Sequence, residues 1–98
     1  MSKNFDLVDF GSAHFEGGNL TFFRAHLRGV SFIGAHLEEA DFSLADLSDA
    51  EFLMACIEGA DLSTATLTGV DLSGAFGDAK TRLPDGMKRP DSWAPYEP

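Results

Sequence analysis

The chain has 98 residues and a hydrophobic fraction of 44%, which is enough apolar material for one small core but not for two. Its 16 acidic and 7 basic residues leave a formal charge of −9, which repels nucleic-acid phosphates and anionic lipid headgroups. Cys56 is the one cysteine, so no internal disulfide can form and packing must hold the fold. Composition therefore argues against a disulfide-stabilised secreted domain and against direct binding to nucleic acid or membranes.

The N-terminal residues 1–4 form a short lead-in without an apolar run or a small-residue cleavage site. No later stretch approaches the ~18 consecutive apolar residues of a membrane span. We therefore expect a cytoplasmic protein.

Large apolar residues then recur with a period of five. Phe5, Phe10 and Phe15 begin the series, and an unbroken run extends from Phe22 to Leu72. A second apolar series, mostly alanine, lies two residues before each member of that run. A pattern this regular indicates an internal repeat.

Neither common element explains a period of five. On an α-helix, five residues rotate by about 140° net, so the large side chains would not share a face. In a strand, an odd step places successive large residues on opposite faces. Both conflicts vanish if the chain turns a corner after each short extended piece, so the pattern predicts a coil with flat sides.

The positions between the apolar residues agree with corners. Glycine and serine, which favour turns, fill many of the two linker positions after each large residue. The four prolines all lie past the repeats, where no backbone N–H has to bond to a neighbouring coil. We expect the repeats to end near Gly77.

Individual repeats carry a family resemblance. Residues 40–44 read ADFSL and residues 60–64 read ADLST. They resemble the bacterial pentapeptide-repeat family, whose signature is alanine, aspartate or asparagine, leucine or phenylalanine, and two variable residues. The resemblance extends over residues 5–76. It implies an all-β fold, a right-handed parallel quadrilateral β-helix, with four pentapeptides per coil.

The repeat count divides the chain into three parts. Fourteen large residues at four per coil give about 3.5 coils for residues 5–77. Residues 78–98 form a proline-containing C-terminal cap or tail, in which residues 81–87 resemble the segment that often follows the last repeat in this family. Trp93 and Tyr96 are expected to fold over the last coil, because a solenoid needs its ends covered.

The register slips by two residues between Phe15 and Phe22. The extra residues lie either in the turn-forming segment Gly17–Asn19 or among residues 21–24. We prefer the first placement, because the second exposes two phenylalanines to water. With either placement the large residues stack in four columns: Phe5, Leu27, Leu47 and Leu67; Phe10, Phe32, Phe52 and Leu72; Phe15, Leu37 and Ile57; and Phe22, Phe42 and Leu62.

The acidic charge is concentrated in the repeats. Between Ala25 and Ala79 there are ten acidic residues against one basic residue, Arg28. We expect these side chains to form a solvated surface; its main members are Asp41, Asp46, Glu51, Glu58, Asp61 and Asp71. The family resemblance implies an alternative, since some members protect bacterial DNA gyrase from fluoroquinolones by imitating DNA. A body of 3.5 coils is ~17 Å tall and matches only ~5 base pairs, so mimicry would require end-to-end assembly.

Two further surface features suggest protein binding. Apolar residues at corner positions would form an exposed interface patch, unless they are simply scattered there; they are Phe23, Ile33, Leu44, Leu53 and Met54. In addition, residues 1–4 are too few to cover the open strand edge of the first coil, which makes that end a candidate for end-to-end self-association.

Metal binding and catalysis have little support in the sequence. His14, His36 and Cys56 fall in one outward column about 5 Å apart, and such residues can bind zinc. However, outward side chains on a flat face point in parallel, and no fourth ligand is evident, so we predict no metal and no cofactor. Since no catalytic motif occurs either, we expect a non-enzymatic structural or protein-binding module whose partner is unknown, with DNA mimicry toward a type II topoisomerase as the alternative.

Overall fold

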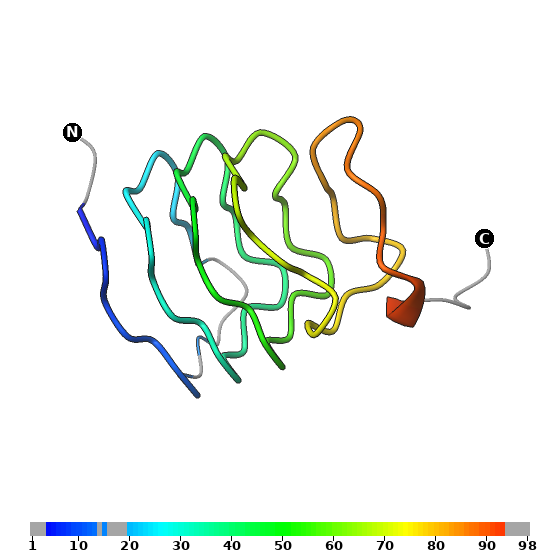
Figure 1. Ribbon diagram of the computed structural model, residues 1–98, viewed down its shortest axis with the longest axis horizontal. Coiled ribbons are helices and arrows are strands. Elements are labelled where there is room, and N and C mark those ends of the chain that lie inside the picture. Colours follow the sequence, from blue (N-terminus) through cyan, green and yellow to red (C-terminus); the bar gives the residue numbers. More distant parts are fainter. Residues whose placement is uncertain (1–3, 14, 16–19, 94–98) are drawn as a thin grey trace.

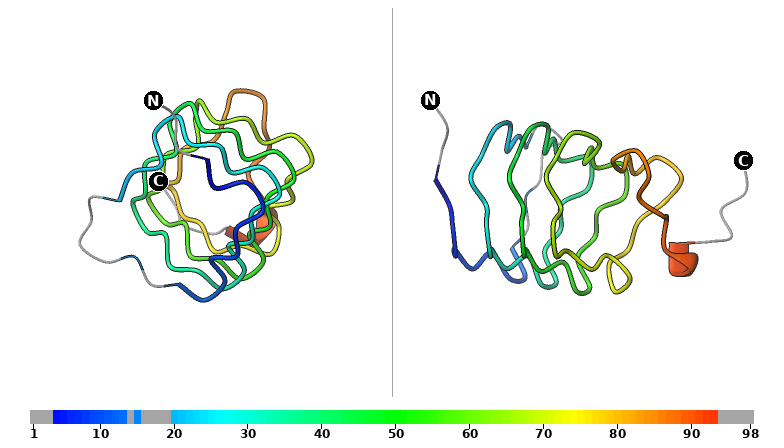
Figure 2. Two further views of the ribbon diagram at one scale, coloured as in Figure 1. Left: turned by 90° about the vertical axis from the view of Figure 1, so that its left-hand side faces the viewer. Right: turned by 45° about the horizontal axis from the view of Figure 1, so that its top comes forward.

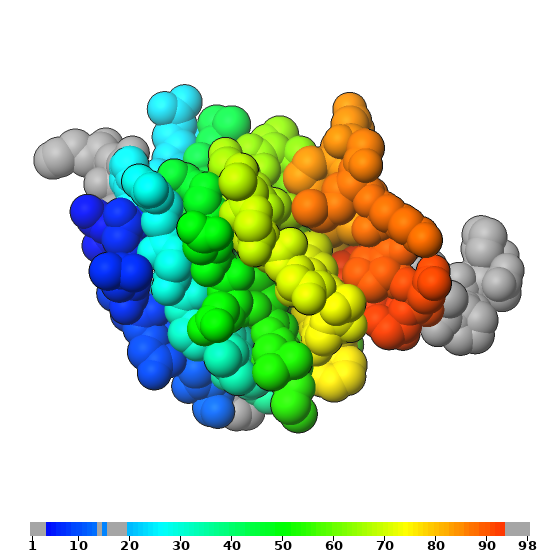
Figure 3. Space-filling model, in the orientation of Figure 1, coloured from blue at the N-terminus to red at the C-terminus, as the bar shows by residue number. Residues whose placement is uncertain are grey.

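The computed structural model describes residues 4–13, 15 and 20–93. The chain winds as a solenoid whose successive coils lie side by side along one axis (Figure 1). Viewed along that axis, the coils superimpose on one closed outline (Figure 2). In the space-filling view neighbouring coils lie directly against one another (Figure 3).

Each side of a coil is so short that coils pair through single-residue parallel bridges rather than long strands. In the regular part, paired residues are 20 positions apart, as in Asp41 and Asp61. One coil is therefore four pentapeptides. The paired residues form four columns: Asn4, His26, Asp46 and Thr66; Asp9, Ser31 and Glu51; His36, Cys56 and Phe76; and Thr21, Asp41, Asp61 and Arg82.

The pairing also locates the register slip. Parallel partners are 22 residues apart at Asn4 and Asp9 but 20 apart from Thr21 to Cys56, and only the last pair, Asp61 and Arg82, is 21 apart. Phe15 still donates its N–H to the carbonyl of His36 in the first register, at 3.4 Å. The two extra residues therefore lie between Phe15 and Thr21, which excludes their placement among residues 21–24. Of the preferred segment itself, residues 17–19 lie outside the described residues.

The large apolar residues fill the axis of the solenoid. From Phe22 to Leu72, no member of the series is more than 8% exposed. Phenylalanines in successive coils stack with their ring centroids 5.1 to 5.4 Å apart, as Phe32 does on Phe52. Burying each such side chain contributes roughly 1.5–3 kcal/mol. The first coil is less enclosed, because its Phe5, Phe10 and Phe15 are only partly buried against this core.

The corners are tight turns. The N–H of the alanine that begins a repeat donates to the carbonyl of the preceding large residue, as Ala45 does to Phe42 at 3.0 Å. The second linker residue often has positive φ, as a type II turn requires. Glycine takes this role at positions such as Gly59, but Glu39 and Met54 also adopt it, with φ of 62° and 61°.

The coiled body continues past Gly77, the predicted last repeat residue. Arg82 forms a parallel bridge with Asp61, so residues 81–83 complete a further side. Thr81 stands where other repeats have alanine and is 1% exposed, and Leu83 packs against the core. The Thr81 hydroxyl is accommodated there because it donates to the carbonyl of Ile57 at 3.0 Å. The parallel pairing therefore extends past residue 77, and the first part of the predicted tail forms a further side of the coil.

The C-terminal end of the solenoid is covered by a short 3-10 helix, η1, at Asp91–Trp93. Trp93 is 4% exposed, and its indole Nε1 donates to the carbonyl of Ala75 at 2.8 Å. Gly77 stands where the repeat pattern calls for a large inward residue. A Cβ built on Gly77 would lie 2.6–2.7 Å from indole ring atoms, so the Trp93 ring occupies the space of the missing side chain.

Arg89 fixes this covering segment to the last coil. Its guanidinium donates to the carbonyls of Asp78 and Thr81 at 2.8 and 3.0 Å and lies 5.7 Å from the centre of a Trp93 ring. Figure 3 shows the segment packed on the end of the solenoid. Tyr96, also expected in the cap, lies outside the described residues.

Candidate interaction surfaces

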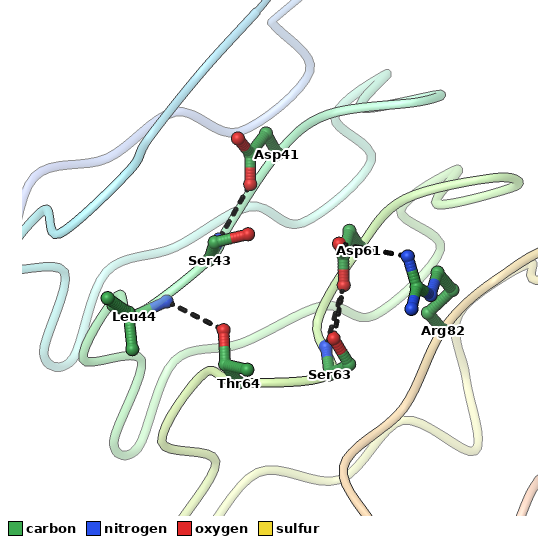
Figure 4. Close-up of polar contacts among 7 residues, drawn as sticks. All are labelled: Asp41, Ser43, Leu44, Asp61, Ser63, Thr64 and Arg82. Carbon is green, nitrogen blue, oxygen red and sulfur yellow. Dashed lines mark hydrogen bonds and ion pairs between the residues drawn. The ribbon is translucent and has the colours of Figure 1, made fainter.

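The aspartates at outward positions of the repeats stabilise the corners. The carboxylate of Asp41 accepts a hydrogen bond from the backbone N–H of Ser43 at 2.8 Å (Figure 4). Asp61 accepts from both the N–H and the hydroxyl of Ser63, at 3.0 and 2.7 Å. Aspartate therefore recurs because it bonds to the chain two residues on, where the turn begins.

These hydrogen bonds favour the charged carboxylate. The hydroxyl hydrogen bond from Ser48 is the main reason that the pKa of Asp46 lies below its ordinary value. Hydroxyl hydrogen bonds from serine likewise lower the pKa of Asp61 and of Asp71. Much of the acidity predicted as a solvated surface has this structural role.

The six predicted acidic residues do not share a face. Asp46 belongs to the first column of bridges, Glu51 to the second, and Asp41 and Asp61 to the fourth. Glu58 lies at the corner after the third column, where one of its carboxylate oxygens is buried without a hydrogen-bond partner among the described residues. The negative charge is therefore distributed around the solenoid.

The five apolar residues predicted as one interface patch lie on two separate corners. The corner after the second column carries Ile33, Leu53 and Met54, and the corner after the fourth column carries Phe23 and Leu44. All five are exposed, between 38% and 58%. Because a coil has four sides, these two corners are diagonally opposite. The structure thus corrects the expectation of a single patch, which overlooked that positions ten residues apart lie half a coil apart.

The N-terminal end of the solenoid presents an aromatic surface. A depression of about 430 Å³ opens there; its lining consists of Phe5, Phe10, Phe15, Leu20, Thr21, Phe22, Phe23 and Ala25. Neighbouring rings meet edge to face, such as Phe10 and Phe15 with centroids 5.7 Å apart. We call this surface the aromatic end.

One cluster of potential metal ligands occurs among the described residues: His36, Glu38 and Cys56, whose ligand atoms all lie within 4.8 Å of one another. His36 and Cys56 are bridged on successive coils, as the column predicted, whereas His14 lies outside the described residues. Glu38 was not predicted. It stands at the first corner position after the strand of His36, so the turn brings its side chain back to the outward face.

The environment of Cys56 is negatively charged. Partial burial raises the pKa of its thiol, and the carboxylates of Glu58 and Glu38 raise it further. The thiol is therefore protonated at neutral pH in the absence of a cation, which makes it a poor nucleophile.

Comparison with known proteins identifies related chains. A family model described as pentapeptide repeats matches residues 25–63 and 55–76, in eight copies. A pentapeptide repeat protein from the thylakoid lumen of Arabidopsis thaliana is 32% identical, with a TM-score of 0.54 over 76% of this chain and 61% of that one. HetL of the cyanobacterium Nostoc, a pentapeptide repeat protein involved in heterocyst differentiation regulation, is 25% identical, with a TM-score of 0.51 over 88% of this chain and 43% of that one.

A third solved structure, the pentapeptide repeat protein Rfr23 from the cyanobacterium Cyanothece, shows the same fold at 24% identity, with a TM-score of 0.55. The match covers 85% of this chain and 63% of Rfr23. The chain thus spans less than two thirds of the length of these three relatives. Among curated proteins no match was found. No helix among the described residues is long and apolar enough to cross a membrane.

Proposed function

Because the chain belongs to the pentapeptide repeat family and has its right-handed quadrilateral β-helix fold, we propose that it is a non-enzymatic structural or protein-binding module that binds its partner through the aromatic end. The observation that carries this proposal is the difference between the two ends. Trp93 closes the C-terminal end, whereas no described residue covers the partly buried rings of Phe5 and Phe10. An apolar surface of this kind marks an interaction site.

The backbone at the aromatic end supports the same conclusion. In the second coil, Ser31 donates its N–H to the carbonyl of Val8 in the coil before, at 3.1 Å. Asp9 occupies the equivalent position of the first coil, and no described coil precedes it. The edge of the first described coil therefore offers backbone groups for pairing with another chain.

We propose a second copy of this chain as the partner. The C-terminal end is closed, so two copies would associate through their aromatic ends, which bury the rings of both chains against each other. Such an arrangement is self-complementary, and Trp93 at the C-terminal end of each copy prevents its continuation into a filament. The product is a dimer about twice as long as the monomer.

Sedimentation and small-angle scattering of the purified protein test this arrangement. Phe23→Glu places a charge beside the aromatic end at an exposed corner and should give a monomer. Leu44→Glu is the matched control, since Leu44 is equally exposed on the same corner one coil further along. A wild-type monomer at all concentrations, or equal effects of both substitutions, would exclude self-association through this end and direct the search to other partners by pull-down.

DNA mimicry is the second candidate function, supported by the net charge of −9. The longest dimension of the chain is 39 Å, which matches about 11 base pairs at ~3.4 Å each, so this function depends on the proposed dimer. Hydrogen-bonded aspartates such as Asp61 keep their negative charge, but their carboxylates are engaged in stabilising the corners. A gyrase supercoiling assay with the wild-type dimer and with Phe23→Glu tests this function. We expect the dimer to inhibit supercoiling and Phe23→Glu not to inhibit it. We propose the cytoplasm as the compartment of either activity.

A further inference from the structure

A His–Glu–Cys cluster lies on the flat face formed by the third column. His36 and Cys56 occupy outward positions on successive coils and are held in register by their parallel bridge. Glu38 follows two residues after His36, and its Oε2 lies 3.5 Å from the His36 Nδ1. The nitrogen, oxygen and sulfur atoms of the three side chains all lie within 4.8 Å of one another.

These distances suit a tetrahedral ion. Bonds of about 2.0–2.3 Å to zinc place neighbouring ligand atoms ~3.3–3.8 Å apart. The pair His36 and Glu38 already has this spacing. The Cys56 sulfur is within 4.8 Å of a ligand atom of each of the other two side chains, so the site requires a rotation of these side chains to reach the tetrahedral spacing.

The acidic side chains in and beside the cluster also favour binding of a cation. Glu58, at the corner after Cys56, has a buried carboxylate oxygen with no hydrogen-bond partner among the described residues. Glu58 follows Cys56 by two residues, as Glu38 follows His36 one coil earlier. A buried anionic oxygen without a donor is costly, and a divalent cation nearby offsets that cost.

We propose that His36, Glu38 and Cys56 form a Zn²⁺ site, with water as the fourth ligand. Neutral imidazole, carboxylate and thiolate together carry a charge of −2, which balances the ion. Sulfur and nitrogen ligands select a borderline-soft metal over Mg²⁺ and Ca²⁺. On binding, the thiol releases its proton to solvent, and the sulfur–zinc bond offsets the cost of that ionisation.

Titration of the metal-free protein with Zn²⁺, followed by calorimetry and native mass spectrometry, tests the proposal. One ion per chain is expected. Cys56→Ser, His36→Gln and Glu38→Gln should each weaken binding roughly tenfold or more. His26→Gln is the matched control, because His26 occupies the same outward position on another column, paired with Asp46, and it should leave binding unchanged.

Substitution with Co²⁺ gives an independent readout of the ligands. The complex should show a thiolate-to-cobalt charge-transfer band that Cys56→Ser abolishes, and the d–d absorption of a four-coordinate ion. Equal melting temperatures of all metal-free variants show that the fold is intact. Absence of saturable Zn²⁺ binding, one ion shared by two chains, binding that survives Cys56→Ser, or an equal loss in His26→Gln would each overturn the proposal.

Discussion

The contact between Gly77 and Trp93 yields a quantitative prediction about how the solenoid ends. Gly77 interrupts the series of large inward residues, and the indole of Trp93 fills the resulting space. A Cβ at position 77 would lie 2.6–2.7 Å from three atoms of a rigid ring, so the covering segment must shift. Overpacking of this kind costs about 1–3 kcal/mol. Gly77→Ala should lower the free energy of unfolding by that amount.

Gly74→Ala provides a matched control. The Cβ there would lie 2.6 Å from a terminal methyl of Leu53, which is 54% exposed and free to rotate away. Neither Gly74 nor Gly77 has positive φ, so the backbone accepts alanine equally at both positions. We expect Gly74→Ala to change the free energy of unfolding by less than about 0.5 kcal/mol.

A double-mutant cycle isolates the contact. Trp93→Ala removes a buried indole and the donor to the Ala75 carbonyl, and should cost about 3–5 kcal/mol. In that background Gly77→Ala should cost almost nothing, because the ring that it displaces is gone. Urea denaturation of the four proteins measures each value. If Gly77→Ala costs the same with and without the indole, Trp93 does not occupy this slot and the reasoning fails.

Three further outcomes follow from the coil and its corners. Leu47→Asp places an unpaired charge on the axis at a 0% exposed position and should abolish the cooperative thermal melt seen by circular dichroism; a native-like melt would contradict the buried axis. Glu39→Gly should stabilise the protein by about 1 kcal/mol, because Glu39 has a φ of 62° that glycine adopts without strain; an unchanged or lower melting temperature would refute this reading of the corner. Because the pKa of Asp46 is lowered in the folded protein, its carboxylate stabilises the fold above the unfolded pKa of ~4. This stabilisation is lost as pH falls through the lower folded value. Urea midpoints measured from pH 5 downward should therefore decline less steeply in Ser48→Ala than in wild type.

The period-five series was sufficient to predict most of the architecture. Large inward residues, alanines two positions earlier and turn formers at the linkers are each local consequences of a four-sided coil, so a single sequence displays all of them. The stacking order followed as well, because a fixed repeat length fixes which residues meet one coil later. The position of the register slip required the structure, because either placement of the two extra residues preserves the period of five on both sides. The pairing of Thr21 decided it.

The departures from the pattern were decided by tertiary contacts. The sequence indicated that the repeats end near Gly77, with Thr81 in the tail. The structure shows that the Thr81 hydroxyl donates to the carbonyl of Ile57. It also shows that the Trp93 ring fills the space beside Gly77. Similarly, the sequence placed His36 and Cys56 in one column but gave no reason to include Glu38, whose direction depends on the turn.

The sequence by itself thus determined what repeats: the period, the inward residues and the four columns, because each of these depends only on spacing along the chain. Only the tertiary structure decided how the repeats end and which surface side chains meet. Those features depend on segments distant in sequence filling the same volume, and no local spacing encodes that.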